Sequence, residues 1–203
     1  MKKLSEYLEA ENGVKDFSQH KRIVIAPGRY NPPHRGHKLV IDKLVALGEQ
    51  LDAKPIVLII DSGKYGPANP LNGEVRKEYL QKMFPKIRFE VYKNPYDAVF
   101  ELAEKEQLIP VGGVAGQDRG DNYKGMVGRI FGNEIKDIYH SEVLHRDPDG
   151  DDLVGISGTK ARKAVTEGNV AAFRAMTGLD DRDSRSLMKL LEDGMNTNGV
   201  QSV

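Results

Sequence analysis

The sequence predicts an α/β fold in which a Rossmann-like, doubly wound parallel sheet of five strands is followed by C-terminal helices. Short apolar runs alternate with segments whose apolar residues recur every three or four positions, as in parallel strands joined by helical crossovers. The runs 21–27 and 54–61 are almost continuously apolar, as strands buried on both faces are. The length of 203 residues favours one hydrophobic core over two.

Each expected strand has its own pattern. Residues 21–27 and 54–61 are predicted to be central strands because charged residues occur only at the ends of their apolar runs. Residues 87–92 alternate apolar and charged side chains, as a strand nearer an edge does. The fourth strand, 108–116, is expected to be shortened or bent by its glycines, and 135–143 is the fifth.

The expected helices lie between these strands and after them. Asn94 and Pro95 open one helix, with Asn as the N-cap residue and Pro in the first turn. The others are predicted, in chain order, around Val40, Leu44, Leu47 and Leu51, over 73–84, from Ser157 or Gly158 to about Glu167, over 169–177 and over 183–194.

The chain divides into three parts. Residues 1–20 are expected to form a short helical extension, and acidic residues interrupt it where a signal peptide would be apolar. Residues 21–178 hold the predicted sheet, and residues 179–203 hold a last helix and a polar, frayed tail. No apolar run approaches the roughly 18 residues of a membrane-spanning helix, so no membrane partner is expected.

Charge and cysteine content exclude several classes of function. Thirty basic and thirty acidic residues cancel, so no global field favours nucleic acid or an anionic membrane as a partner. The absence of cysteine excludes disulfides, thiolate zinc sites and cysteine nucleophiles, and it fits the cytoplasmic location that we expect. Any binding of phosphate must therefore depend on a few well-placed groups.

The segment that follows the first strand, residues 28–37, carries groups suited to an anion. Gly28 permits a sharp turn and a close approach of the backbone to a ligand. His34 and His37 lie three residues apart at the start of a helix, where imidazoles and helix amides can converge on one phosphate. An incidental pair of histidines is the alternative. A metal site is not predicted, because no third and fourth ligand lies at a supporting spacing.

Residues 156–162 form a second candidate phosphate site at the start of a later helix. Ser157 and Thr159 offer hydroxyl groups, and the first amides of a helix lack partners within it. Arg162 projects a forked donor about one turn further on. Ser-Gly-Thr at a helix start is by itself more often a simple cap, so the phosphate interpretation depends on its pairing with the first motif.

Both motifs resemble signatures of the nucleotidyltransferase superfamily, whose order of elements residues 21–178 follow. His34 to His37 matches the (H/T)xGH signature, and 156–162 matches ISGTxxR. Residues 28–34 are most similar to archaeal-type nicotinamide mononucleotide adenylyltransferases, and phage-encoded relatives look similar too. The resemblance implies that His34, His37 and Arg162 are catalytic. The nucleotide-binding residues that it implies are Gly28, Arg29, Tyr30, Gly36, Asp118, Ile156, Ser157, Gly158, Thr159 and Lys160.

Two further segments are similar to parts of the archaeal-type enzymes. Residues 69–76 resemble their NPFTxxER segment, which implies that Asn69 shapes a loop and that Arg76, with Arg29, lies near the acceptor phosphate. Residues 116–119 resemble a turn near the nucleotide ribose, where Asp118 is either a ribose or magnesium-water ligand or an ordinary loop carboxylate. The acidic run 147–152 lacks the closing Glu of a calcium loop and is interpreted as a mobile loop.

The resemblance implies transfer of a nucleoside monophosphate from an NTP to a phosphate-bearing small molecule, with release of pyrophosphate. AMP from ATP is favoured over CMP, and nicotinamide mononucleotide is the favoured acceptor, so that NAD is formed. Mg²⁺ is expected to arrive with the NTP. The chain has no Trp, so a nicotinamide ring would need another aromatic, such as Tyr92 or Tyr123. A homo-oligomer is left open.

Several alternatives remain beside this interpretation. A cytidylyltransferase or a pantetheine-phosphate adenylyltransferase would use the same chemistry, although Arg29 and the ISGT pattern speak against both. A non-catalytic nucleotide-binding sensor is the alternative from another class, although it would be free to lose the histidines. Chemistry like that of the aminoacyl-tRNA synthetases is disfavoured by the short chain and by the absence of a KMSKS-like sequence.

Overall fold

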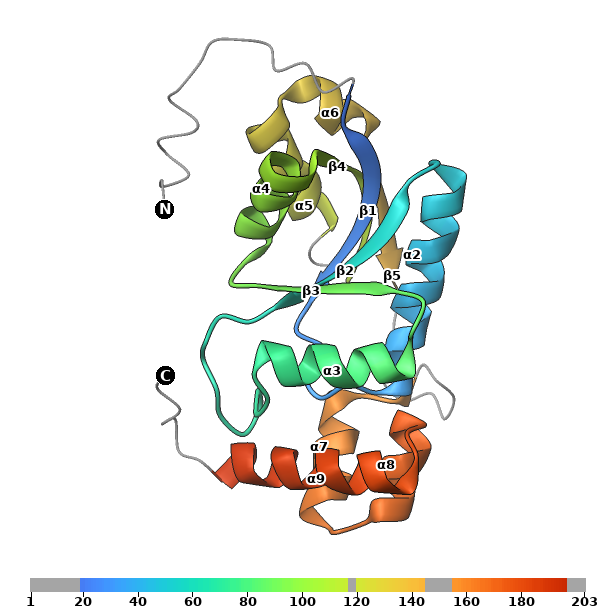
Figure 1. The fold of residues 1–203 in the computed structure, drawn as a ribbon, viewed down its shortest axis with the longest axis vertical. Helices are drawn as coiled ribbons and strands as arrows, with labels where there is room; N and C mark the ends of the chain where they lie inside the picture. The colour runs from blue at the N-terminus through green and yellow to red at the C-terminus, as the bar shows by residue number, and fades with distance from the viewer. Residues whose placement is uncertain (1–18, 117–119, 145–154, 197–203) are drawn as a thin grey trace.

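The computed structural model describes residues 19–116, 120–144 and 155–196 (Figure 1). Five parallel strands form one sheet in the order β3-β2-β1-β4-β5. The strands are β1 (Lys21–Gly28), β2 (Lys54–Ile60), β3 (Arg88–Tyr92), β4 (Leu108–Gly116) and β5 (His140–Leu144). The Rossmann-like α/β fold expected from the sequence is thereby confirmed, and β3 is an edge strand as its alternating pattern predicts.

Helices cover both faces of the sheet, with α2 on one side and α4 and α5 on the other (Figure 1). Successive residues of β1 serve opposite faces: Ile23 and Ile25 join the core beneath α4 and α5, while Val24 and Ala26 join the core beneath α2. The helices are, in chain order, α2 (Lys38–Gln50), α3 (Gly73–Met83), α4 (Pro95–Glu106), α5 (Gly120–Phe131) and α6 (Asn133–Ile138).

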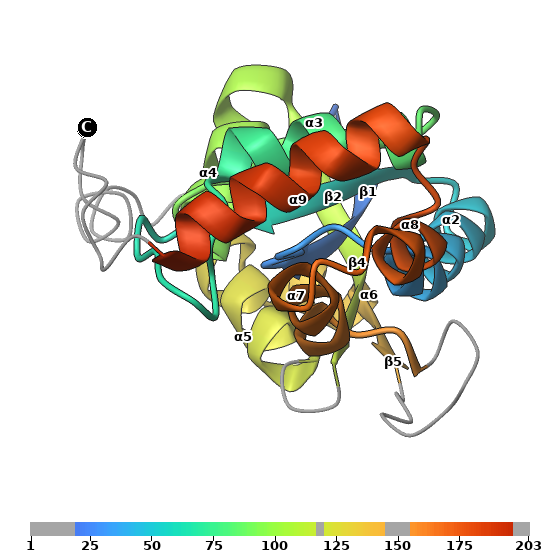
Figure 2. The same cartoon turned by 90° about the horizontal axis from the view of Figure 1, so that it is seen from below.

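Three C-terminal helices lie beyond the carboxyl end of β1, as Figures 1 and 2 show. They are α7 (Gly158–Thr166), α8 (Val170–Thr177) and α9 (Asp181–Asn196). Phe173, Leu187 and Leu191 are fully buried in a third apolar cluster, which also takes Leu71 and Tyr79 from the α3 region. This cluster, which includes Ala161, Ala164 and Val165 of α7, therefore packs the three helices together and against the α3 region. Within the described ranges, no helix is long and apolar enough to cross a bilayer.

Two predictions about secondary structure are wrong in detail. The strand expected over 135–143 begins only at His140, because residues 133–138 form α6. Ile135 and Ile138, three residues apart, fit a helical turn as well as an apolar strand segment, and Gly132 starts the turn with a φ of 90°. Helix α5 was not predicted, although Met126 and Val127 lie on its buried face.

Other predictions match the observed elements or lie outside them. The Asn94 side chain accepts a hydrogen bond from the Asp97 amide at 2.9 Å, which is the predicted cap of α4. The helical extension expected over 1–20, the mobile loop expected around 147–152 and the frayed tail after 196 fall wholly or mostly outside the described residues.

Candidate active site

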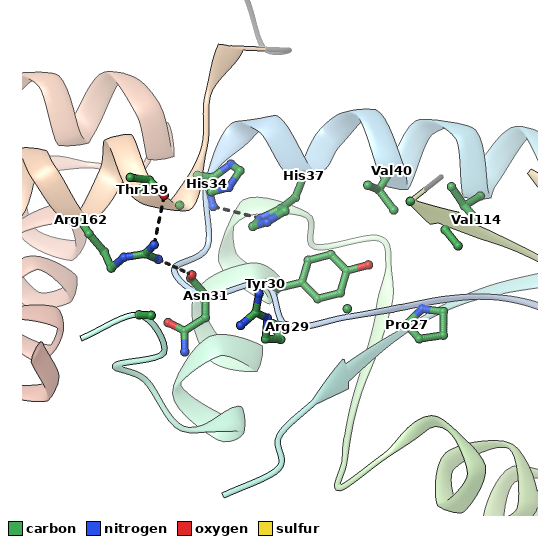
Figure 3. Close-up of a pocket in the computed structure, with 15 residues that line it drawn as sticks. Pro27, Arg29, Tyr30, Asn31, His34, His37, Val40, Val114, Thr159 and Arg162 are labelled. Atoms are coloured by element: carbon green, nitrogen blue, oxygen red, sulfur yellow. Dashed lines mark hydrogen bonds between the residues drawn. The ribbon is translucent and has the colours of Figure 1, made fainter. Parts of the chain in front are cut away.

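A cavity of about 610 Å³ opens at the carboxyl ends of β1 and β4 (Figure 3). The chain runs outward from β1 to β2 and β3 on one side and then returns to β4 on the other, so the cavity lies at the topological switch point. Its apolar wall is made by Pro27, Val40, Val114 and Ala115. Its larger polar side chains are Arg29, Tyr30, Asn31, His34, His37 and Arg162.

The two histidines of the first motif stack on each other in the cavity wall, with ring centroids 3.8 Å apart and planes 24° apart. Both are almost fully buried, with 2% of His34 and 5% of His37 exposed. The His34 backbone amide donates to Nδ1 of His37 at 3.2 Å. A neutral His37 ring therefore carries its proton on Nε2, which makes that atom a hydrogen-bond donor.

Tyr30 fixes the position of His37 from the other side. Its ring meets His37 edge-on, with centroids 4.9 Å apart, and its hydroxyl donates to the Ala26 carbonyl at 2.9 Å. Its backbone is left-handed, with a φ of 51°. A Cβ at Gly28 would lie 2.7 Å from this ring, so the close approach requires glycine. Tyr30 is therefore a buried wall of the site rather than an open stacking surface.

The two sequence motifs touch through Gly36. A Cβ at this residue would lie 2.8 Å from the Ile156 carbonyl oxygen and 2.9 Å from Nδ1 of His34. Glycine thus lets the segment before α7 approach the histidine loop backbone to backbone. Residues more than a hundred positions apart in the sequence are brought to one cavity in this way (Figure 3).

The second motif presents the start of α7 to the cavity. Ser157 caps the helix by accepting the Lys160 amide at 3.2 Å, and Gly158, Thr159 and Arg162 line the cavity. Arg162 donates from Nη2 to the Thr159 hydroxyl at 3.2 Å. The exposed Lys160 side chain and Ser157 are outside the lining, so only part of the predicted set meets the cavity directly.

The cavity is electropositive. Arg29 and Arg162 both line it, and within the described part of the chain the lining includes no Asp or Glu. Burial, and then the charge of Arg29, lower the pKa of Arg162 below its ordinary value. Two guanidinium groups without an acidic neighbour in the wall, next to a helix N-terminus and two imidazoles, suit a polyanionic ligand.

Asn31 joins the two motifs to a third segment and was not singled out from the sequence. Its backbone carbonyl accepts from Nη1 of Arg162 at 3.1 Å. Its side-chain amide donates to Asn69 Oδ1 at 2.7 Å and to the Leu71 carbonyl at 2.9 Å. Only its place inside the first motif could have drawn attention to it. Asn69 also donates to the Lys64 carbonyl at 2.6 Å and so shapes its loop, as expected.

Arg76 lies differently from the expectation. Its side chain has no exposed surface and is outside the cavity lining, and it pairs with Asp61 at 3.1 Å. The expected direct contact with an acceptor phosphate is therefore corrected, because protein groups surround this guanidinium.

The other residues named from the sequence lie outside the cavity lining or outside the described ranges. Asp118 falls outside the described residues. Tyr123 is 8% exposed and packs in the core with α4 and α5, and Tyr92 packs against the same core, so neither lines the cavity. In the described ranges, no three His, Asp or Glu side chains cluster in a way that could hold a metal ion.

Comparison with known proteins shows likeness in fold only. No family model and no curated protein sequence matches the chain. The structure resembles nicotinic acid mononucleotide adenylyltransferase of Plasmodium falciparum complexed with NaAD, at 15% identity and a TM-score of 0.54, over 85% of this chain and 98% of that one. The same enzyme complexed with APC gives 14% identity and a TM-score of 0.53 over the same shares.

A macrolide-efflux protein from Streptococcus pneumoniae is also similar, with 18% identity and a TM-score of 0.50 over 81% of this chain and 59% of that chain. Neighbours with such different descriptions share the α/β architecture, and identities this low establish no more than that architecture. The function must therefore be argued from the cavity.

Proposed function

We propose that the protein is a nucleotidyltransferase that moves AMP from ATP to the phosphate of a mononucleotide and releases pyrophosphate. One observation carries the proposal: the two motifs converge on a single electropositive cavity at the switch point of the sheet. Histidines from one motif and an arginine and helix N-terminus from the other face the same space. This arrangement suits a triphosphate that must be held at both its α-phosphorus and its leaving end.

The proposed reaction is a direct displacement. An acceptor phosphate oxygen attacks the α-phosphorus, a new P–O–P bond forms, and the bond to the β-phosphate breaks as pyrophosphate leaves. His37, with Nε2 as its donor, and His34 would stabilise the oxygens of the transition state. Thr159 and Arg162 would hold the leaving group, and Arg29 the acceptor phosphate. Because the attacking oxygen is already anionic, catalysis rests on positioning and charge rather than on a protein nucleophile.

The acceptor is proposed to be nicotinamide mononucleotide or its carboxylate analogue, nicotinic acid mononucleotide. The resemblance of residues 28–34 supports the first, and the enzyme of Plasmodium falciparum, which has a similar fold, acts on the second. Tyr30 is the one aromatic side chain in the described lining besides the histidines, and its ring is buried. The acceptor would therefore be selected mainly through its phosphate rather than by stacking of its ring.

Mg²⁺ is proposed to enter with the triphosphate. The described lining has no carboxylate, and its side-chain oxygens are those of Tyr30, Asn31 and Thr159, so its imidazole and guanidinium groups fit the phosphates better than the bare cation. When bound, the cation would neutralise charge on the triphosphate. The protein's own contribution is to orient the phosphates with Arg29, Arg162 and the first amides of α7.

Pyrophosphate release tests this proposal. The protein is incubated with Mg²⁺, each of the four NTPs, and nicotinamide mononucleotide, nicotinic acid mononucleotide or pantetheine phosphate. We expect release with ATP and one of the two mononucleotides, abolished in Arg162→Ala and retained in Arg182→Ala, whose side chain is exposed on α9. Binding of an NTP without release for any acceptor would contradict an enzyme and favour the sensor.

A further inference from the structure

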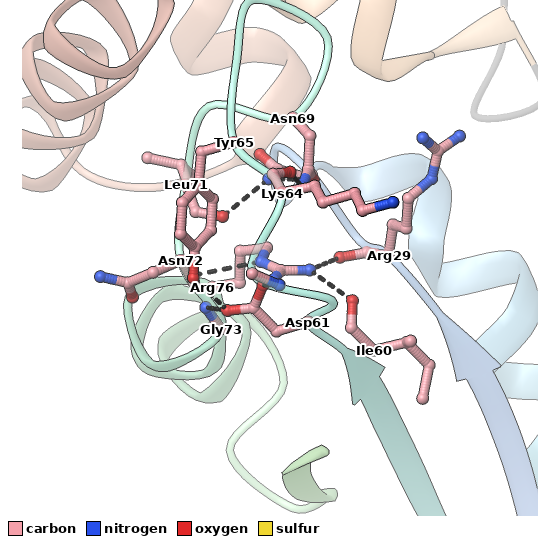
Figure 4. A network of polar contacts seen from close by, with 12 residues as sticks. Arg29, Ile60, Asp61, Lys64, Tyr65, Asn69, Leu71, Asn72, Gly73 and Arg76 are labelled. Atoms are coloured by element: carbon pink, nitrogen blue, oxygen red, sulfur yellow. Dashed lines mark hydrogen bonds and ion pairs between the residues drawn. The ribbon is translucent and has the colours of Figure 1, made fainter. Parts of the chain in front are cut away.

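The guanidinium of Arg76 joins three separate segments, one of which carries the cavity residue Arg29 (Figure 4). Nη1 donates to the Arg29 carbonyl and, at 3.1 Å, to the carbonyl of Ile60, where β2 ends. Nε donates to the Asn72 carbonyl at 3.1 Å, at the start of α3. One side chain thus ties the loop after β1, the end of β2 and the first turn of α3 together.

Asp61 completes this network from the loop that follows β2. Its Oδ1 lies 3.1 Å from Nη2 of Arg76 and accepts the Gly63 amide at 3.2 Å. Its Oδ2 accepts the Tyr65 hydroxyl at 2.8 Å and the Gly73 amide at 2.5 Å. The carboxylate therefore neutralises the buried charge and, at the same time, holds both ends of the segment 61–73.

A guanidinium is suited to this role in a way that an ammonium is not. Arg76 has no exposed surface, so its donors depend on protein groups: Nε and Nη1 donate to carbonyls, and Nη2 has the charge of Asp61 beside it but no hydrogen bond among the described residues. Its planar fork points donors in several fixed directions, whereas Lys has a compact point charge at the end of a flexible stem. Burial lowers the pKa of Arg76 below its ordinary value, against the opposing charge of Asp61.

The network acts on Arg29, which is held by its backbone and free to project its side chain. Arg76 fixes the Arg29 carbonyl, and the next residue, Tyr30, is fixed by its left-handed backbone and its bond to Ala26. In Figure 4 the Arg29 side chain runs away from Arg76, and it lines the cavity. We propose that Arg76 and Asp61 are positioning residues that aim Arg29 at the acceptor phosphate, an inference that rests on the proposed function.

A double-mutant cycle between Arg76 and Arg29 tests this coupling. Arg76→Lys is expected to raise KM for the acceptor about tenfold, with kcat changed less than about threefold, because partners in one network show such interaction energies. In an Arg29→Ala background the same substitution should raise that KM less than about twofold, since the group being positioned is gone. KM for ATP is measured in all four proteins as the internal control. A full tenfold effect in both backgrounds would overturn the proposal.

A second variant and a second readout keep the test independent of catalysis. Asp61→Asn should repeat the pattern of Arg76→Lys, whereas Tyr65→Phe removes only one of the partners of Asp61 and should change KM less than about twofold. Hydrogen–deuterium exchange of Arg76→Lys should be at least about tenfold faster in residues 27–33 and 61–73, and unchanged in 121–131.

The two readouts separate failure of this inference from failure of the proposed function. A wild-type protein that transfers no nucleotide to any acceptor would contradict the proposed reaction. Hydrogen–deuterium exchange would then be the test of whether Arg76 holds the loop of Arg29. Unchanged exchange over 27–33 in Arg76→Lys would overturn the positioning of Arg29, whether or not the protein is an enzyme.

Discussion

Two arginines that the sequence places near phosphate, Arg162 on α7 and Arg76 on α3, occupy opposite environments. Arg162 lines the cavity and donates to one carbonyl and one hydroxyl group. Arg76 is fully buried, donates to three carbonyls and pairs with Asp61. The same residue type thus faces a ligand in one region and holds the backbone in the other.

The two guanidinium groups differ in whether the protein supplies them with an anionic partner. Nε and Nη1 of Arg76 donate to three carbonyls, and Nη2 is paired by charge with the Asp61 carboxylate at 3.1 Å without a hydrogen bond in the described part of the chain. Arg162 meets two protein acceptors within the described residues, and its charged neighbour is Arg29 rather than an acid. An arginine with unused donors and a like-charged neighbour is one that an anion would stabilise, whereas Arg76 already has its anion.

The largest expected effect is a difference in the free energy of unfolding between substitutions of Arg76 and of Arg162. Arg76→Met should lower the free energy of unfolding by about 3–5 kcal/mol, because it leaves the Asp61 carboxylate without its charged partner in a poorly solvated position. Arg162→Met should lower it by about 1 kcal/mol, the usual net value of a hydrogen bond or two at a partly exposed site. Urea unfolding of both variants measures the difference, and equal losses would remove the contrast.

His37→Ala should have the next largest effect, on catalysis rather than on folding. If its Nε2 donates to an oxygen of the transition state, removing it should raise the barrier by about 3–4 kcal/mol, the scale for a lost preorganised donor. The Kd for ATP should change far less than kcat. Steady-state kinetics and equilibrium binding check this, and equal losses in kcat and in affinity would show that His37 only binds.

Sequence patterns predicted the parts of the site that follow directly from chain geometry. His34 and His37 follow the end of β1, and Arg162 lies one turn into a capped helix, so the sheet and the cap together bring them to the cavity. Periodicity likewise predicted the central strands, because burial on both faces leaves almost no polar residue in them.

The remaining features depend on contacts between distant segments. The resemblance of residues 69–76 placed Arg76 near the acceptor phosphate, but its buried ion pair depends on Asp61, which lies in the loop after β2. The strand expected from residue 135 failed because Ile135 and Ile138 suit either structure, and packing of α6 against α5 decides between them. Asn31 is a short polar residue in a loop, and nothing local shows that it bridges Arg162 and Asn69.

Gly36→Ala should have a smaller effect on stability, and it tests the contact between the two motifs. A Cβ there would lie 2.8 Å from the Ile156 carbonyl, and forcing the segments apart should cost about 1–3 kcal/mol of stability, as overpacking does. Gly125→Ala, on α5 with open space around the added Cβ, is the matched control and should stabilise by about 0.5–1 kcal/mol. Thermal unfolding should show that Gly36→Ala destabilises the protein and that Gly125→Ala stabilises it. Changes of the same sign would mean that the two motifs do not touch at Gly36.

The smallest expected effect comes from a third arginine, Arg88 on β3, which pairs with Glu106 at the surface. Both side chains are about two-fifths exposed, so Arg88→Ala should cost less than about 1 kcal/mol at pH 7, and 1 M salt should remove most of that difference. Hydrogen bonding to Arg88 lowers the pKa of Glu106 below its ordinary value of 4.5.

Because this folded-state pKa is the lower one, the stabilisation by the Arg88–Glu106 pair is fully present above pH 4.5 and is lost as the pH falls through the folded value. Unfolding curves of wild type and Arg88→Ala should therefore converge in acid and in high salt. The same salt series applied to Arg76→Met should leave its large deficit nearly unchanged, since a buried pair is poorly screened. Equal salt sensitivity of the two deficits would place Arg76 in contact with solvent and restore it as a candidate ligand for phosphate.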